Sequence, residues 1–353
     1  MKQLHILSIV FLTLFYSTFS FAQLTDVVTG LNDPRGLAIH GTNLYVAQFD
    51  SEKISKIDLT AATPTTTDVV STDRPTGIIF NGTDLYISND SGFLGVTNPM
   101  AASPSVTSYY YNDADFIYCY QMAINGNDLY IASPEDNSIK IVDITSISSM
   151  ETDFVTGLNE PSGLAFYGTD LYISEMGSTG IKISKVDITA SSPTPTDVVT
   201  GISTGPIALA FLGTDLYIAE FGGSKVSKID ITATSPTRSD VVTGLTRPIG
   251  LTFHGTDLYI SHEGKISKFI MPTLSVNTKE ATNLLTVYPN PTTGSFQVSG
   301  LTEKENYQIY NILGSQIKTG TATNKKPIDV SNVPNGIYFL KFENGNTIKL
   351  VKE

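Results

Sequence analysis

The chain has 353 residues and a formal net charge of −12, with 34 acidic residues against 22 lysines and arginines. This length allows about two domains of ordinary size. The charge is uneven: residues 24–278 hold 28 acidic and 13 basic residues, a net −15, whereas residues 279–353 hold six acidic and eight basic ones, a net +2. An N-terminal part this acidic repels nucleic acid and anionic membranes, so we expect neither as a partner.

Residues 1–22 have the pattern of a secretory signal peptide. An apolar run at 6–16 follows a lysine, and small residues precede a cut before Gln23. The run is shorter than the ~20 residues that a bilayer core requires, and no later stretch qualifies as a transmembrane segment. We therefore expect an exported chain. Its single cysteine, Cys119, excludes an intramolecular disulfide, so burial and strand pairing must hold the fold.

One phrase, Gly-x-x-Leu-Tyr, recurs six times. Its tyrosines are spaced 41 to 45 residues apart, at Tyr45, Tyr86, Tyr130, Tyr172, Tyr217 and Tyr259. A period in the low forties is typical of four-stranded propeller blades. Residues 161–188 show the pattern inside one unit: two short apolar runs are joined by Gly-Thr-Asp hairpin residues, and an alternating third run follows. A Pro/Ser/Thr loop and the run TDVVTG complete the unit.

The number of strands predicts how the ring closes. The sixth unit ends at residues 265–271 without a TDVVTG run, but the mature chain begins with one at residues 24–30. We expect these two segments to pair, so that the N-terminal strand completes the last blade and no open end remains. Residues 23–271 then form a six-bladed all-β propeller. Its repeat resembles that of NHL-type propellers and, more loosely, that of gluconolactonase-like and strictosidine-synthase-like proteins.

The sequence after residue 271 changes character. Residues 272–283 have linker composition, and residues 284–353 contain short alternating runs separated by Pro-Asn-Pro, Leu-Gly and Asn-Gly turns. These features predict a small Ig-like β-sandwich. Its motifs, YPNP at 288–291, YNILG at 310–314, GIY at 336–338 and the closing KLVK at 349–352, resemble the C-terminal sorting domain of the type IX secretion system of Bacteroidetes. The resemblance implies that the secretion machinery is a partner and that the protein is released or held at the cell surface.

Candidate site residues are those that differ between blades on one face of the propeller. This face carries the loops from fourth to first strands and from second to third strands. The candidate channel-mouth residues are Arg35, Gln48, Asn89, Tyr120, Glu175, Glu220, His262 and Glu263. Asn89, Glu175 and Glu220 offer the oxygen ligands that Ca²⁺ prefers, so they form a candidate metal site. The other interpretation is that these side chains hydrate the mouth and cap strand ends.

The sequence shows no complete catalytic constellation, whether a G-x-S-x-G elbow, an H-E-x-x-H motif or a P-loop. The leading hypothesis is therefore a binding or interaction module for an unknown protein, glycan or small molecule. The alternative is a metal-dependent hydrolase or lactonase of the gluconolactonase-like or strictosidine-synthase-like type. The gluconolactonase resemblance is incomplete, because Pro34-Arg35-Gly36 stands where that family has Glu-Gly-Pro.

Overall fold

The computed structural model describes residues 23–109, 121–146, 150–178, 180–202, 204–271, 285–311, 315–343 and 346–353. These residues are organised in strands and turns, which confirms the predicted all-β class. The chain divides into two compact units, residues 1–273 and 274–353.

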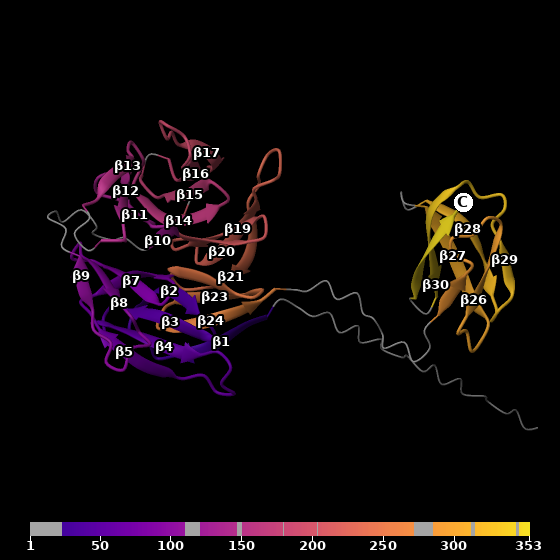
Figure 1. Cartoon of the computed structure of the whole chain (residues 1–353), viewed down its shortest axis with the longest axis horizontal. Helices are drawn as coiled ribbons and strands as arrows, with labels where there is room; N and C mark the ends of the chain where they lie inside the picture. The colour runs from indigo at the N-terminus through magenta and orange to yellow at the C-terminus, as the bar shows by residue number, and fades with distance from the viewer. Residues whose placement is uncertain are drawn as a thin grey trace, which may run out of the picture. The chain divides into compact units, whose positions relative to one another are not determined.

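The described part of the first unit is a six-bladed propeller, in which every blade is a four-stranded antiparallel sheet (Figure 1). Blade one consists of β2 (Pro34–His40), β3 (Asn43–Gln48), β4 (Lys53–Asp58) and β5 (Thr66–Ser71). Blade two consists of β6 (Pro75–Asn81), β7 (Asp84–Asn89), β8 (Leu94–Thr97) and β9 (Thr107–Tyr109). Blade three consists of β10 (Met122–Asn125), β11 (Asp128–Ser133), β12 (Ser138–Asp143) and β13 (Thr152–Val155). Blade four consists of β14 (Pro161–Tyr167), β15 (Asp170–Glu175), β16 (Lys182–Asp187) and β17 (Thr196–Thr200). Blade five consists of β18 (Pro206–Leu212), β19 (Asp215–Glu220), β20 (Lys225–Asp230) and β21 (Ser239–Thr243). Blade six consists of β22 (Gly250–His254), β23 (Asp257–His262), β24 (Lys265–Ile270) and β1 (Gln23–Thr29).

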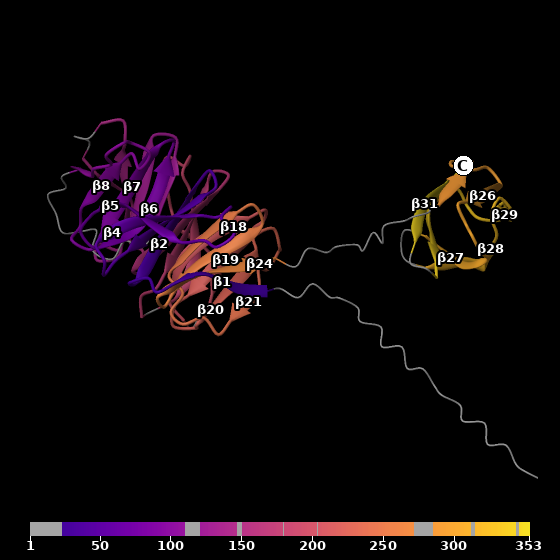
Figure 2. The same cartoon turned by 90° about the horizontal axis from the view of Figure 1, so that it is seen from below.

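The ring closes through the pairing that the number of strands predicts. The strand β1 runs antiparallel to β24, with Gln23 opposite Ile270 and Thr29 opposite Lys265. Both views show the indigo β1 beside the orange β24 (Figures 1 and 2). A bulge between Asp26 and Val28 shifts the register, as it does in the outer pairs of blades one, four and five. The strand β1 therefore pairs with its third strand in the same way as the fourth strands of those blades, although it precedes its blade in the sequence.

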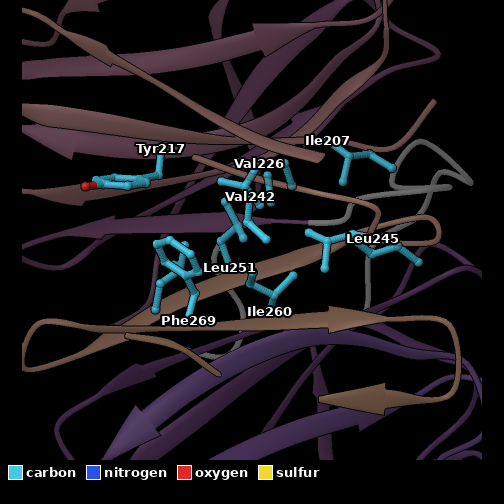
Figure 3. Packing of buried hydrophobic residues seen from close by; sticks show 12 residues of the cluster. Ile207, Tyr217, Val226, Val242, Leu245, Leu251, Ile260 and Phe269 are labelled. Carbon is cyan, nitrogen blue, oxygen red and sulfur yellow. The ribbon is translucent and has the colours of Figure 1, made fainter. Parts of the chain in front are cut away.

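Aromatic contacts join successive blades, and they explain the repeated tyrosines. In four of these contacts, a second-strand tyrosine meets a phenylalanine of the next first strand edge to face, with ring centroids 5.0 to 5.2 Å apart: Tyr45–Phe80, Tyr130–Phe166, Tyr172–Phe211 and Tyr217–Phe253. At the other two junctions an isoleucine takes the place of phenylalanine. Such pairs contribute about 0.5–1.5 kcal/mol each beyond the burial of their area. Figure 3 shows one of these interfaces, where Val226 and Val242 of blade five face Leu251, Ile260 and Phe269 of blade six.

The first strands approach one another closely around the axis. A Cβ atom placed on Gly36 would lie 2.8 Å from the backbone nitrogen of Ile78, and one on Gly163 would lie 3.0 Å from the Cα of Ala208. Only glycine or another very small residue fits where two inner strands come this near. The equivalent residue of blade three, however, is Gln121.

The second unit is a two-sheet β-sandwich, as predicted. One sheet has the order β25 (Thr286–Tyr288), β26 (Ser295–Ser299), β29 (Pro327–Asp329), and the other has the order β28 (Gln316–Ala322), β27 (Glu305–Asn311), β30 (Gly336–Phe342), β31 (Thr347–Lys352). Phe296, Ile309, Leu340 and Phe342 lie at the centre of its core. Asn290 accepts a hydrogen bond from the backbone of Val351 at 2.8 Å and donates one to the carbonyl of Lys349 at 2.7 Å, so it holds the last strand in place.

Deleting residues 23–29 should destabilise the propeller strongly. The deletion exposes the edge of β24 and opens the ring, and we expect a loss of several kcal/mol from a total that is usually about 5–15 kcal/mol. Thermal unfolding measures the loss. As a matched control, residues 23–29 are replaced by residues 194–200, whose last five letters, TDVVT, are identical to those of β1. This control should keep the midpoint, and an unchanged midpoint in the deletion itself would contradict the closure.

Candidate functional site

The last residue of each second strand is polar and lies among buried surroundings. These strand-end residues are Gln48, Asn89, Ser133, Glu175, Glu220 and His262. Glu175 and Glu220 are 1% and 0% exposed, so a lone carboxylate at either place would be strongly disfavoured. Each strand-end residue must therefore find hydrogen-bond partners close by.

Blade one shows how the need is met. Gln48 donates from Nε2 to the Oγ of Ser55 on the third strand at 2.7 Å, and its Oε1 accepts from the backbone nitrogen of Asn32 at 3.3 Å. Ser55 in turn donates to Asp68 on the fourth strand at 3.0 Å, and Lys53 binds the same carboxylate at 2.9 Å. We call this connected set of side chains the polar chain of the blade. It links the second, third and fourth strands and satisfies each buried group.

Blades four and five have glutamate in place of glutamine, so the serine donates to the glutamate and the lysine alone reaches the fourth-strand aspartate. Glu175 accepts from Ser184 at 2.6 Å and from the backbone nitrogen of Asn159 at 2.9 Å, and Lys182 lies 3.7 Å away. A hydrogen bond to Asp197 raises the pKa of Lys182, and Glu175 adds to this effect. In both blades the strand-end carboxylate is thus held by donors of its own blade and of the loop leading into it.

Glu220 differs from Glu175 because it pairs directly with an arginine. It accepts hydrogen bonds from Ser227 and Thr204, and Arg238 lies 3.0 Å from its Oε2. Arg238 comes from the segment before the fourth strand and keeps 23% of its side chain exposed. The guanidinium therefore neutralises a carboxylate that solvent does not reach.

In blade six the polar chain passes through the closing strand. His262 Nε2 lies 2.7 Å from Ser267 Oγ, which donates to Asp26 of β1 at 2.7 Å. Since the serine gives its proton to the carboxylate, the neutral ring must carry its proton on Nε2. Burial lowers the pKa of His262 and Lys265 lowers it further, against the opposing effects of Asp26 and Glu263. The hydrogen bond from Ser267 lowers the pKa of Asp26 despite partial burial, and Lys265 contributes to the same direction.

Blades two and three depart from the pattern. Asn89 accepts from the backbone nitrogen of Phe93 at 2.9 Å and caps its own turn. In blade three a lysine replaces the third-strand serine: Lys140 lies 2.9 Å from both Asp136 and Asp153, and Ser133 donates to Asp136 at 3.2 Å. Although burial acts to lower it, these two hydrogen bonds raise the pKa of Lys140 well above its usual value.

The structure therefore distributes the predicted site residues over separate blades. Asn89, Glu175 and Glu220 each bind partners of their own blade or of the loop leading into it. Within the described ranges, no group of three or more His, Cys, Asp or Glu side chains could hold a metal ion. These contacts do not bring the three side chains together as calcium ligands, and the calcium site stays a prediction.

The remaining candidates lie near the same loops. Arg35 binds Asp33 through Nη2 at 2.7 Å, and its guanidinium carbon lies 3.2 Å from the ring centroid of Phe49. Glu263 lines a recess of about 490 Å³ together with His262 and Lys265. Tyr120 lies outside the described residues.

A central cavity of about 470 Å³ is lined by the first strands of all six blades. Gln121, which is not among the predicted site residues, extends from blade three to the inner strands of blades four and five. Its Oε1 accepts from the backbone nitrogens of Leu164 at 3.0 Å and Leu209 at 2.8 Å, and its Nε2 donates to the carbonyl of Leu209 at 2.7 Å. The signal available in the sequence was a large polar residue at a position that is glycine or alanine in the other five blades.

Residues 286–353 match the family described as the secretion system C-terminal sorting domain. The second unit is a type IX sorting domain. This domain directs the protein to the cell surface or the extracellular space through the type IX machinery. None of the described segments forms a helix long and apolar enough to cross a membrane. No curated protein matches the chain in sequence.

Solved propellers resemble the first unit in fold at low sequence identity. A gluconolactonase from Xanthomonas campestris aligns with a TM-score of 0.60 and 12% identity over 71% of this chain and 90% of its own. An aldose sugar dehydrogenase from Streptomyces coelicolor gives 0.56 and 15% over 70% and 98%, and a virginiamycin B lyase from Staphylococcus aureus gives 0.52 and 14% over 70% and 99%. These three proteins have three different activities, so the likeness shows a shared fold and leaves the function open.

Replacing His262 by glutamine should flatten the acid dependence of stability. A histidine whose pKa is lowered by folding takes up a proton more readily when unfolded, so the free energy of unfolding falls as pH drops below about 6.5. Glutamine makes the equivalent bond to Ser55 in blade one, so H262Q should fold and lose this slope. Urea unfolding between pH 8 and pH 5 measures it.

The converse variant, Gln48→His, builds the same histidine beside Ser55 and Asp68 and should steepen the slope. Equal slopes in H262Q, Q48H and the natural chain would contradict the assignment.

The two buried glutamates should respond unequally to the same substitution. Glu175→Gln recreates the glutamine of blade one and should cost less than about 1 kcal/mol. Glu220→Gln leaves Arg238 without its anionic partner and should cost about 1–3 kcal/mol. Chemical denaturation of both variants gives the comparison. If E175Q destabilised the chain as much as E220Q, the ion pair with Arg238 would not be the distinguishing interaction.

Proposed function

We propose that this protein is an exported β-propeller that acts as a binding module, delivered by its type IX sorting domain to the surface or the medium. The observation that supports a binding role most directly is the engagement of the strand-end carboxylates. Glu175 and Glu220 are buried and hydrogen-bonded within their blades and the loops that enter them, so neither is presented to a substrate as an acid, base or metal ligand. A partner would be a protein, a glycan or a small molecule.

The alternative function is a metal-dependent hydrolase or lactonase acting at the channel mouth. It is favoured by the fold shared with the Xanthomonas gluconolactonase and by the oxygen ligands of Asn89, Glu175 and Glu220. Binding a cation there would require the two carboxylates to leave Ser184 and Ser227, since both bonds now hold them inside the blades.

Metal analysis of the purified full chain separates the two functions. We expect no stoichiometric metal after dialysis against Ca²⁺-containing buffer, and no turnover of lactone or ester substrates. Stoichiometric Ca²⁺ that is lost in E175Q together with E220Q, with hydrolysis lost in parallel, would overturn the binding role in favour of the hydrolase. An E175Q variant with its metal intact would exclude that residue as a ligand.

Removing residues 284–353 should leave the propeller in the periplasm. The predicted signal peptide still carries the chain across the inner membrane, but the sorting domain that the type IX machinery recognises is gone. Cell fractionation with detection of the propeller tests this. The matched control joins residues 272–353 to an unrelated periplasmic protein, which should then appear outside the cell. Normal surface levels of the truncated chain would contradict the sorting role.

A further inference from the structure

The exposure of the inner strands that line the central cavity rises from one end of the strands to the other. In β2, β6, β14 and β18 the first residues are mostly buried, whereas the last two or three are half-buried or exposed. The buried ends lie where the inner strands come close enough to require glycine. The cavity therefore opens on the face that carries the turns between first and second strands, which we call the hairpin face.

The wall of the cavity is largely peptide backbone. An inner strand has a neighbour on only one side, so every second residue directs both its N–H and its C=O towards the axis. Leu164 and Leu209 show this orientation, because their N–H groups reach Gln121. Leu37, Ile78 and Leu251 have the same register against their second strands. The same donor and acceptor edge therefore continues around the axis.

Gln121 shows which chemical group this wall accepts. Its amide oxygen and nitrogen bind the N–H and C=O of Leu209, the pair of bonds by which an added strand would join the edge. The protein's own side chain thus places an amide on the backbone of the channel. An ester or a carboxylate in the same position would lack the donor for the carbonyl of Leu209.

Aromatic rings surround the outer half of the cavity. Each ring lies two residues after the residue of its strand whose N–H and C=O face the axis. The four residues are Phe80, Phe166, Phe211 and Phe253. At the rim, His40 packs on Phe80 with ring centroids 4.9 Å apart and Tyr167 packs on Phe211 at 5.2 Å. The path from Leu37 to the rim at His40 covers three residues, or about 10 Å of strand.

We propose that the channel is a binding site for a small amide-bearing ligand with an apolar or aromatic body, such as a short peptide, which enters from the hairpin face. The amide binds inner-strand edges beside Gln121 and the apolar body lies among the phenylalanines. The volume of about 470 Å³ is in the range of ordinary ligand sites. This inference rests on the binding role proposed above and adds to it a site and a ligand class.

The test compares an amide with its ester. 3-Phenylpropanamide, which has a single amide and an aromatic body, and methyl 3-phenylpropanoate are titrated into the full chain and followed by calorimetry. We expect saturable one-to-one binding of the amide and at least about tenfold weaker binding of the ester, since the ester lacks the N–H donor. Equal affinities, or no binding of the amide, would overturn the site.

Two sets of variants place the binding in the channel. Phe211→Ile and Phe253→Ile introduce the residue that Ile39 and Ile124 already supply in blades one and three, so the fold tolerates it. Both should weaken the amide severalfold. Gln121→Ala copies Ala208 of blade five and removes the internal amide. Acetamide, which restores the lost atoms, should raise the melting temperature of Q121A more than that of the natural chain. Unchanged affinity in both Phe→Ile variants would overturn the location.

The two proposals fail in different ways. Hydrolysis of the amide probe, detected by chromatography after incubation, would contradict the binding role itself. Intact probe with no measurable affinity would contradict only the channel site, because the metal and hydrolysis assays do not depend on it.

Discussion

The propeller depends on one long-range pairing, that of β1 with β24. A single blade cannot bury its apolar faces alone, and six blades stacked in a row would leave two such faces exposed. Pairing Gln23–Thr29 with Lys265–Ile270 turns the row into a ring in which every blade has two neighbours. The contact also supplies Asp26 to the polar chain of blade six, across 241 residues of sequence. Backbone pairing and a buried polar network therefore fix the same junction.

Inside this ring, the repeated side chains form interfaces and the backbone forms the channel. The tyrosines of the repeated phrase pack between blades, and the glycines at the start of the inner strands permit the strands to meet near the axis. A serine that precedes the strand-end residue in blades two, four and six reinforces this contact. Ser261, for example, accepts from the nitrogen of Gly250 and donates to the carbonyl of Arg35 in the next blade. Blades one, three and five have alanine there, so the propeller alternates between two kinds of blade.

Much of this architecture follows from the sequence, and the reason is physical. The blades are predicted by the period near 42 residues and by the hairpin glycines, which reflect local geometry. The closure is predicted by the TDVVTG run at the N-terminus, which supplies the missing strand. Contacts between side chains of different strands leave no such local signal. Residue type alone did not show that Ser55, Ser184, Ser227 and Ser267 would bind the strand-end residues. The position of Gln121 in the channel depends on how three blades converge, which no single repeat encodes.

Variation between repeats is therefore evidence of function only when the rest of the blade does not account for it. Glutamate at residue 220 is matched by Arg238, histidine at 262 by Asp26 and Ser267, and the altered third strand of blade three by Lys140 between two aspartates. In each case the change has a partner in the same blade, and packing and charge balance explain it. Gln121 is different, because it binds backbone groups of blades four and five that the repeat would contain in any case. Its long polar side chain occupies a position where the close approach of the strands in other blades favours glycine. Its bonds to Leu209 show the chemical property that the inner strands share, which is a row of backbone N–H and C=O groups directed at the axis.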